Sequence, residues 1–311
     1  MNKIDIVIPY YNDNDPIWKK ILYDYMEKEG SNDRQVIGEE RYREWDCFKY
    51  WFRCVENNCP WVNKIFLIVA SESQIPDWLD TTNPKLRIVY HRDYIPEELL
   101  PTFNTLTIEL FVCRIKDLSD NYIYCNDDYF FLNPVKSTMF FIDDIPVYRD
   151  TKSKFEKFGA YWTDSSDGTF YKVLNNTMDL QYKIVGDKAN CYSIDHLPVP
   201  HKKDFELEIT NKYLDEFIKA NSKSGFRSPE MYSNHLFTSV YRDTKPYYKF
   251  DYTDSYYLTV KKDTNFNDHS KCKMICFNDT EQLSSEDFKE VKNRMIEFFE
   301  DKFPNKSSFE K

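Results

Sequence analysis

The chain has 311 residues, of which 30% are charged, and its formal net charge is −10 at pH 7. A chain of this length can bury a large core, in one big α/β domain or two small ones. The negative charge argues against binding of duplex nucleic acid and against a polybasic membrane anchor, because both need a basic surface.

The sequence indicates a cytoplasmic protein. No apolar run approaches the ~18 residues that span a membrane, and the first apolar run is too short for a signal peptide. We therefore expect no transmembrane segment, although the protein could associate peripherally with the inner face of the membrane. The eight cysteines are scattered without a CxxC pair. This favours reduced thiols over a zinc site or a disulfide scaffold.

Residues 4–8 predict a first strand, and a polar loop containing Asn12 and Asp15 follows it. This loop occupies the position of a first strand-to-helix turn, where a nucleotide could dock. The chain has no GxGxxG or Walker sequence and only six glycines. Phosphate must therefore be bound without a glycine-rich cradle.

Apolar residues at positions 45, 48, 52 and 55 predict an amphipathic helix that ends before Pro60. Arg41 and Arg43 lie at its amino end, where the helix dipole disfavours cations. They either pair with acids or face an anionic ligand, and spacing alone slightly favours the ion pairs.

The elements alternate along the chain. Residues 64–70 and 87–91 predict further strands, and residues 104–118 predict a helix. Residues 284–287 have the composition of a helix N-cap, and an apolar stripe from Phe288 to Phe298 predicts a C-terminal helix. The alternation favours an α/β fold, Rossmann-like or GT-A-like, with a mostly parallel sheet and helices on both faces.

Residues 122–131 are β-prone but are interrupted by Asn126, Asp127 and Asp128. In a continuous strand the two carboxylates would point to opposite faces, one of them into apolar surroundings, so we expect a turn. Oxygen ligands at the carboxyl end of a strand suit Mg²⁺ or Mn²⁺, together with substrate phosphates. The alternative is an ordinary polar strand-to-loop junction.

Two features of the second half point to the same chemistry. Asp279 follows a β-prone run, 274–278, and in a parallel sheet it would reach the same edge as Asp127. Arg227 precedes a predicted helix, 231–241, and its guanidinium could bind phosphate or pair with Glu230.

His196 and His201 both flank prolines, which stiffen the segment. A poised imidazole that accepts a proton is one interpretation. Spacing alone favours the other, which is two surface histidines in a proline-rich turn.

Four groups of motifs resemble the blocks of the Stealth family. This family comprises bacterial capsular-polysaccharide hexose-1-phosphate transferases and a eukaryotic relative, the N-acetylglucosamine-1-phosphotransferase that tags lysosomal enzymes. Residues 4–16 resemble the first block, although Asp13 stands where we expect a small residue. The segments that resemble the second block are 41–43, 59–62, 75–79, 91–93, 100–104, Arg114 and 126–128; those of the third are 195–201 and 225–230; and those of the fourth are 274–279 and 303–310.

The resemblance implies a transferase that moves hexose-1-phosphate from a UDP-sugar to a glycan hydroxyl, with a lipid-linked glycan as one candidate acceptor, and releases UMP. It tips His196, rather than His201, toward catalysis as the general base, with Asp127 as the alternative base and Arg227 as a further catalytic residue. The metal, Mg²⁺ or Mn²⁺, would be held by Asp127, Asp128 and Asp279. The residues implied to bind substrates are Asn12, Asp15, Arg41, Arg43, His91, Asn104 and Arg114.

We expect one catalytic domain, in which residues 1–135 bind the nucleotide sugar and residues 136–311 complete the site on the acceptor side. Two other functions stay open. A metal-dependent glycosyltransferase of GT-A type would attack the sugar carbon and release UDP. A non-catalytic glycan-binding module is suggested by the 17% of aromatic residues, but it would not need this set of acids.

Overall fold

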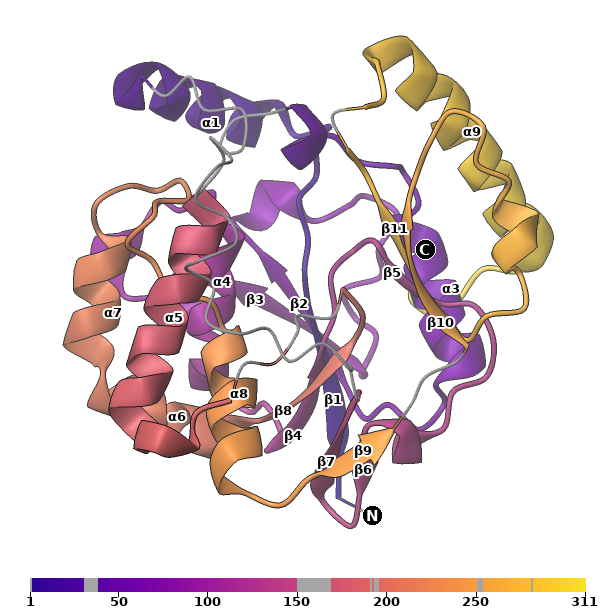
Figure 1. Ribbon diagram of the computed structural model, residues 1–311. Coiled ribbons are helices and arrows are strands. Elements are labelled where there is room, and N and C mark those ends of the chain that lie inside the picture. Colours follow the sequence, from indigo (N-terminus) through magenta and orange to yellow (C-terminus); the bar gives the residue numbers. More distant parts are fainter. Residues whose placement is uncertain are drawn as a thin grey trace.

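A five-stranded sheet forms the centre of the computed structural model, which describes residues 2–30, 39–149, 169–190, 192, 196–250, 254–280 and 282–311 (Figure 1). In spatial order its strands are β3 (Leu86–Tyr90), β2 (Ile65–Val69), β1 (Ile4–Pro9), β4 (Asn121–Tyr124) and β8 (Val199–Lys202). The first four are parallel, and β8 is antiparallel to β4. The predicted mostly parallel α/β sheet is therefore confirmed, and the order is consistent with a GT-A-like fold.

Both faces of this sheet are buried, because successive side chains point to opposite sides of a strand. Ile6 of β1 packs in one core with helix α3 (Phe48–Asn58), whereas its neighbour Val7 packs in a second core on the other face. Apolar runs like those of β1 and β2 are typical of sheets covered on both sides. The helices of the second core are α4 (Thr105–Leu110), α5 (Thr169–Val185), α6 (Lys203–Lys212), α7 (Leu214–Asn221) and α8 (His235–Thr244).

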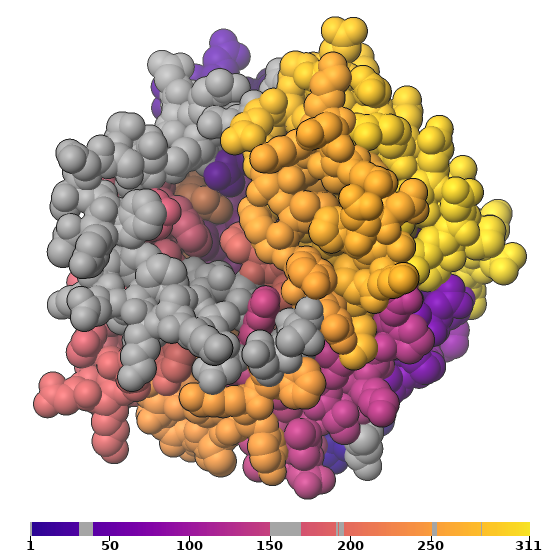
Figure 2. Space-filling view, turned by 45° about the vertical axis from the view of Figure 1, so that its right-hand side comes forward, coloured from indigo at the N-terminus to yellow at the C-terminus, as the bar shows by residue number. Residues whose placement is uncertain are grey.

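A second sheet lies beside the first and is covered by the C-terminal helix. Its central strand β11 (Met274–Asn278) pairs antiparallel with β5 (Tyr129–Phe131) and parallel with β10 (Ser255–Thr259). Helix α9 (Ser285–Lys302) packs on it, with the rings of Phe277 and Phe299 6.0 Å apart. The orange-to-yellow part that contains β10, β11 and α9 forms the upper right of the face in Figure 2.

The remaining elements are short or peripheral. A third sheet contains β6 (Phe141–Ile142), β7 (Ile145–Arg149) and β9 (Tyr248–Phe250), and helix α1 (Pro16–Glu29) lies at the edge of the molecule in Figure 1. The 3₁₀ helices are Glu39–Arg41, Glu72–Gln74, His91–Asp93, Glu97–Leu99, Val112–Arg114, Ser137–Met139, Gly186–Lys188 and Phe266–His269.

Three predicted helices begin or end elsewhere than the sequence pattern suggested. Helix α3 begins at Phe48 rather than near Arg41, because Asp46 has a φ of +56°, which an α-helix does not allow. The helix predicted at 104–118 ends at Leu110, and the one predicted at 231–241 begins at His235. Both segments contain buried apolar residues, Phe111 and Leu118 after α4 and Met231 before α8, and there tertiary packing overrides helical periodicity.

The C-terminal helix has the predicted start and the predicted buried stripe. The Ser284 side chain accepts a hydrogen bond of 3.1 Å from the backbone N–H of Asp287, as an N-cap does. Phe288, Val291 and Met295 are buried. The pattern of caps and apolar spacing was sufficient here because both are local features of the helix.

The seven cysteines among the described residues are free and buried. Burial raises the pKa of the Cys113 thiol to about 12 and that of Cys272 to about 11. The absence of disulfides among these seven agrees with the expected reduced thiols. No described helix is both long enough and apolar enough to cross a membrane.

A buried ion pair fastens the C-terminal segment to α3. The Arg53 guanidinium donates to both carboxylate oxygens of Glu310 at 2.7 Å and to the Phe303 carbonyl at 2.8 Å. Arg53 is only 6% exposed. The carboxylate is therefore the counter-charge of a guanidinium that has left water.

We predict that Glu310→Ala lowers the free energy of unfolding by about 3 kcal/mol or more, because it leaves the Arg53 charge buried without its partner. The measurement is urea denaturation at pH 7. Asp24→Ala is the matched control, since it breaks an exposed pair with Lys20 and should cost less than about 1 kcal/mol. Equal, small effects would show that Arg53 finds water or another acceptor.

Candidate active site

The cavities of the described residues gather where β1 and β4 end. From β1 the chain continues outward to β2 and β3, and it then returns to β4 on the other side of β1. Such a switch point is where open α/β sheets bind ligands, beyond the carboxyl ends of the strands. A groove of about 220 Å³ lies there, which we call the sheet-edge groove. Its lining includes Tyr10, Tyr11, Trp18, Ala70, His91, Phe103 and residues 126–128.

The predicted turn is present at residues 126–128, and it joins the two sheets. On one side the Cys125 N–H donates to the Val7 carbonyl of β1 at 2.9 Å. On the other side the Phe277 N–H of β11 donates to the Asp128 carbonyl at 3.0 Å. The two carboxylates are therefore held at the junction between sheets by backbone contacts on both sides.

The surroundings of both carboxyl groups disfavour their ionised form. Burial raises the pKa of Asp127 to about 6, and burial together with the Asp127 charge raises that of Asp128 to about 7. One oxygen of Asp128 accepts from the Cys276 thiol at 3.2 Å, and its other oxygen, Oδ1, is buried with no hydrogen-bond partner among the described residues. An orphaned carboxylate oxygen beside a second carboxylate is a donor set that suits a hard divalent cation.

Glu44 is a third acid of this site, and the sequence reasoning missed it. It lines an acidic pocket of about 170 Å³ together with Asp127, Asp128 and Asp279. Burial, and then the charges of Asp46, Asp127 and Asp13, raise the pKa of Glu44 to about 9. A signal was available in the sequence, since the acid follows directly after Arg43 in a family-like segment.

A cluster of three acids lies at the rim of the acidic pocket. Carboxylate oxygens of Asp13, Glu44 and Asp46 lie within 4.8 Å of one another, and the described residues contain no other such group of acids, histidines or cysteines. Asp46 also pairs with Lys292. The predicted trio of Asp127, Asp128 and Asp279 thus shares a pocket without converging on one point.

Asp279 pairs with Arg43 in a two-pronged contact of 2.5 and 2.7 Å. The same guanidinium donates to the carbonyls of Thr280 and Leu283 and lies 4.2 Å from the ring centre of Phe288. For Arg43 the ion-pair alternative therefore holds. The sequence analysis placed Asp279 beside Asp127 at the edge of one parallel sheet. That reason was wrong, because β11 lies in the second sheet and is antiparallel to β5. Strand β11 nevertheless ends at this pocket.

Arg41 and Arg227 line the cavities around the turn. Arg41 borders the sheet-edge groove and the acidic pocket, and both arginines border a further cavity of about 270 Å³ beside Asp279. The alternative partner of Arg227, Glu230, accepts from Ser228 and lies 3.5 Å from Lys223. The structure thus brings two guanidinium groups to the region of the paired carboxylates.

The two histidines lie in different environments. His196 borders a cavity that Arg227 also lines, and its ring packs 4.9 Å from that of Tyr257. The packing lowers its pKa by partial burial, although the side chain still reaches solvent. Asp195, the first residue of the third predicted block, lies outside the described residues.

His201 is not a surface histidine. It is 3% exposed, and its Nδ1 lies 2.6 Å from a carboxylate oxygen of Glu206, which is 2% exposed. The other oxygen of Glu206 accepts from the Tyr122 hydroxyl. The interpretation as a pair of surface histidines was therefore wrong for His201.

Two of the implied substrate-binding residues make structural contacts. Asp15 caps α1 by accepting from the Ile17 N–H at 2.9 Å, and it also accepts from Ser73 and Gln74. Asn12 is bound through its backbone to the Gln74 side chain. Their contacts fix the first loop against the segment that follows β2.

The other three implied residues differ in position. Asn104 caps α4 and lines the cavity that holds Arg41 and Arg227. His91 lines the sheet-edge groove, and burial lowers its pKa to about 4, so the imidazole is neutral at pH 7. Arg114 is exposed at the end of a 3₁₀ helix and lines none of the cavities described above.

Two family models match this chain. Residues 41–147 match the Stealth protein CR2, conserved region 2, and residues 266–311 match the Stealth protein CR4, conserved region 4. The first includes the turn at 126–128, and the second includes Asp279 and Glu310. The matched regions thus supply both sides of the acidic pocket.

Curated relatives match this chain, some of them over its whole length. The capsular polysaccharide phosphotransferase WcwK of Streptococcus pneumoniae is 34% identical over 100% of this chain and 99% of its own length. The exopolysaccharide phosphotransferase cps2G of Lactiplantibacillus plantarum is 27% identical over 99% of this chain and 96% of its own. The receptor polysaccharide phosphotransferase WefC of Streptococcus oralis is 38% identical over 51% of this chain and 48% of its own. The full-length similarity and the two matched regions show that this chain belongs to the Stealth family.

Proposed function

We propose that the protein transfers hexose-1-phosphate from a UDP-sugar to a hydroxyl of a glycan and releases UMP, in the synthesis of a capsular or other extracellular polysaccharide. The observation that carries the proposal is the pair of desolvated carboxylates at the switch point of the sheet, with two arginines and a histidine around it. The similarity to proteins named as polysaccharide phosphotransferases supports the same class of reaction. A cytoplasmic location, at the inner membrane face for a lipid-linked acceptor, is part of the proposal.

The sheet-edge groove suits the nucleotide. Its walls include the aromatic rings of Tyr11, Trp18 and Phe103, on which a uracil base can stack, and it leads to Asp127. The two phosphates then lie beside the turn. A Mg²⁺ or Mn²⁺ ion bound by Asp127 and Asp128 would neutralise the charge of the diphosphate, using substrate oxygens as its other ligands.

The chain's own residues supply the rest of the chemistry. Arg41 and Arg227 approach the phosphates from the cavity they share and can bind oxygens in a planar, two-pronged manner. His196 accepts the proton of the acceptor hydroxyl, whose oxygen forms a bond to the sugar-linked phosphorus. The bond from that phosphorus to the oxygen of UMP breaks, and UMP leaves.

The nucleotide product separates this proposal from the glycosyltransferase alternative. Incubation with UDP-sugars, Mg²⁺ and glycan acceptors should release UMP, which anion-exchange chromatography resolves from UDP. Release of UDP in proportion to glycan product would show attack at the sugar carbon and overturn the proposal. Absence of any nucleotide product or UDP-sugar binding would favour a glycan-binding module.

We predict that Asp127→Asn and Asp128→Asn each lower turnover about a hundredfold or more, because metal charge stabilisation contributes several kcal/mol to the transition state. Folding should not suffer. Since burial raises both carboxyl pKa values, ionisation destabilises the metal-free fold: stability falls as the pH rises from about 4, the ordinary carboxyl pKa, and the loss is complete above about 7. Each Asn variant should therefore match or exceed the parent melting temperature at pH 8 without metal.

The same variants should lose the rise in melting temperature that Mg²⁺ causes in the parent protein. Asp301→Asn, at the exposed end of α9, is the control and should keep both the activity and the Mg²⁺ response. Full activity in both test variants would remove the paired carboxylates from the mechanism.

We predict that His196→Ala lowers the rate about a hundredfold or more, the usual scale for loss of a general base. Because its pKa lies below the ordinary value, the imidazole is neutral at pH 7, and activity should fall only as the pH drops below about 6.5. The variant should lose this acidic limb and keep its melting temperature. The measurement is the pH profile of UMP release.

His201→Ala should instead lower the free energy of unfolding by about 3 kcal/mol, since it leaves Glu206 buried without its imidazole partner. The two variants thus separate catalysis from stability. If His196→Ala kept the parent pH profile, Asp127 would become the favoured base.

A further inference from the structure

A second pocket shares Asn126 with the sheet-edge groove, and the donor placed in that groove does not use it. We call it the distal pocket. It has a volume of about 180 Å³ and lies between α4, β4, the start of α8 and the segment around His196. Asn126 and Thr105 line both the distal pocket and the sheet-edge groove, so the two cavities meet at the turn that carries the paired carboxylates.

The lining of the distal pocket has the chemistry of a sugar site. Tyr129 and Phe170 offer aromatic surface, while Glu109, Asn234 and Asn126 offer hydrogen-bonding groups. A pyranose ring presents apolar C–H faces and a rim of hydroxyls, so it binds best where rings and a few fixed polar groups converge. Glu109 is central to this pocket, because the Tyr124 hydroxyl donates to one of its oxygens at 3.1 Å.

Burial raises the pKa of Glu109 to about 7, even though Tyr124 donates to it and Arg227 and His201 lie near. Burial of Glu109 destabilises its ionised form, and Glu109 has no part in the donor chemistry proposed above. Hydroxyl groups of a sugar would stabilise it by hydrogen bonding.

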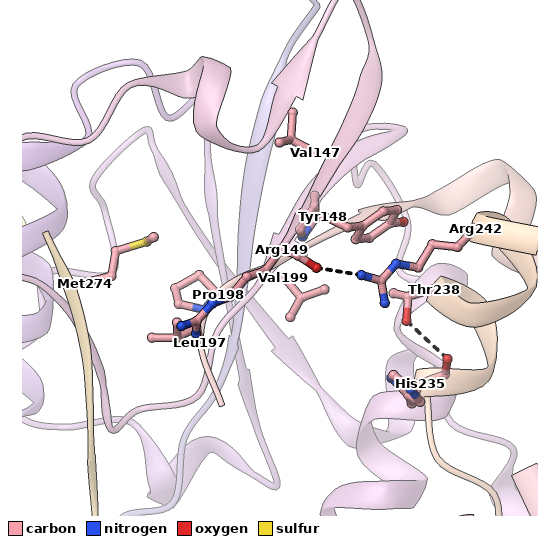
Figure 3. A pocket seen from close by; sticks show the side chains of 11 residues that line it. Val147, Tyr148, Arg149, Leu197, Pro198, Val199, His235, Thr238, Arg242 and Met274 are labelled. Atoms are coloured by element: carbon pink, nitrogen blue, oxygen red, sulfur yellow. Dashed lines mark hydrogen bonds between the residues drawn. The ribbon is translucent and has the colours of Figure 1, made fainter. Parts of the chain in front are cut away.

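The adjoining cavity is too small to be the sugar site. Figure 3 shows it between Val147, Leu197 and Arg242, and its volume of about 40 Å³ holds about one water molecule. His235 and Thr238 line both cavities. Their positions are fixed by α8, where the Thr238 hydroxyl donates to the His235 carbonyl at 3.1 Å and Arg242 donates to the Arg149 carbonyl at 2.8 Å (Figure 3).

The position of the pocket indicates which sugar it binds. Displacement at phosphorus needs the entering oxygen roughly in line with the leaving group. In the proposed function UMP occupies the sheet-edge groove, so the acceptor must reach the phosphorus from another cavity, and the proposed base His196 lines the distal pocket. Arg227 borders both this pocket and the cavity beside Asp279, and so lies between the acceptor and the phosphates.

We propose that the distal pocket binds the attacking sugar residue of the acceptor glycan, and that Glu109 and Asn234 accept or donate hydrogen bonds to its hydroxyls. The role of this sugar as the acceptor rests on the proposed function. The existence of a sugar site in this pocket can be tested by binding alone.

The test uses methyl glycosides of glucose, galactose, mannose and N-acetylglucosamine as probes, with the full-length protein saturated with UMP and Mg²⁺. Saturation-transfer NMR should show binding of at least one probe to the parent. Glu109→Gln, which keeps an oxygen for Tyr124, and Asn234→Ala should each weaken it about tenfold, the cost of one hydrogen bond to a sugar hydroxyl. Glu208→Gln, on the exposed face of α6, should bind as the parent does.

A second titration separates acceptor from donor sugar. Calorimetry gives the dissociation constants of UDP and of UDP-glucose, UDP-galactose and UDP-N-acetylglucosamine for each variant. In our assignment the ratio of the UDP-sugar constant to the UDP constant is unchanged in Glu109→Gln. A tenfold rise of that ratio would place the donor hexose in the pocket and overturn the assignment.

Probe binding that is equal in parent, Glu109→Gln and Asn234→Ala would likewise overturn it, as would the absence of any probe binding to the parent. Melting temperatures of both variants, compared with that of Glu208→Gln, identify a variant that fails to fold, and the other variant then decides. These readouts do not depend on the nucleotide released. Release of UDP would therefore refute the proposed function while leaving the sugar site in place.

Discussion

The site depends on one short turn that belongs to two sheets at once. Strand β4 pairs with β1, and β5 pairs with β11, so the residues between them are held from both sides. Neither sheet alone would hold Asp127 and Asp128 in a desolvated position. The cost appears in their raised pKa values, and packing elsewhere in both sheets must offset it. A strained, charged turn of this kind is expected where binding of a cation or substrate relieves the strain.

The arginines around this turn have two different roles: one forms a structural ion pair, and the others line the cavities. Arg43 and Arg41 are two residues apart, yet Arg43 donates its hydrogen bonds to Asp279 and to carbonyls near the start of the C-terminal helix. That contact ties the region before α3 to the end of β11. Arg41 instead borders the cavities, one of which is also lined by Arg227, a residue distant in the sequence. In a chain with a net charge of −10, such local placement of arginines is what makes binding of an anionic donor feasible.

Features that depend on neighbouring residues could be predicted from the sequence, whereas contacts between distant segments could not. The turn at Asp127 followed from the clash between adjacent carboxylates and apolar flanks, and the cap at Ser284 followed from local spacing. Burial of His201 depends on the pairing of β8 with β4, which brings Tyr122 beside it. The direction of β11 and the approach of Glu44 to Asp127 likewise arise from packing of the second sheet. No periodicity or short motif carries that information.

The protonation of Glu44 makes the acidic pocket less negative, which would favour binding of the proposed diphosphate donor. With a pKa of about 9 its carboxyl group is neutral at pH 7, and a neutral carboxyl donates a hydrogen bond where a carboxylate would repel phosphate. The raised pKa is caused by burial first, and then by Asp46, Asp127 and Asp13. A cation bound at Asp127 would weaken one of these contributions, so metal binding and the proton on Glu44 oppose each other. In the proposed function these two linked equilibria would keep the ionised acids few enough for an anionic donor to enter.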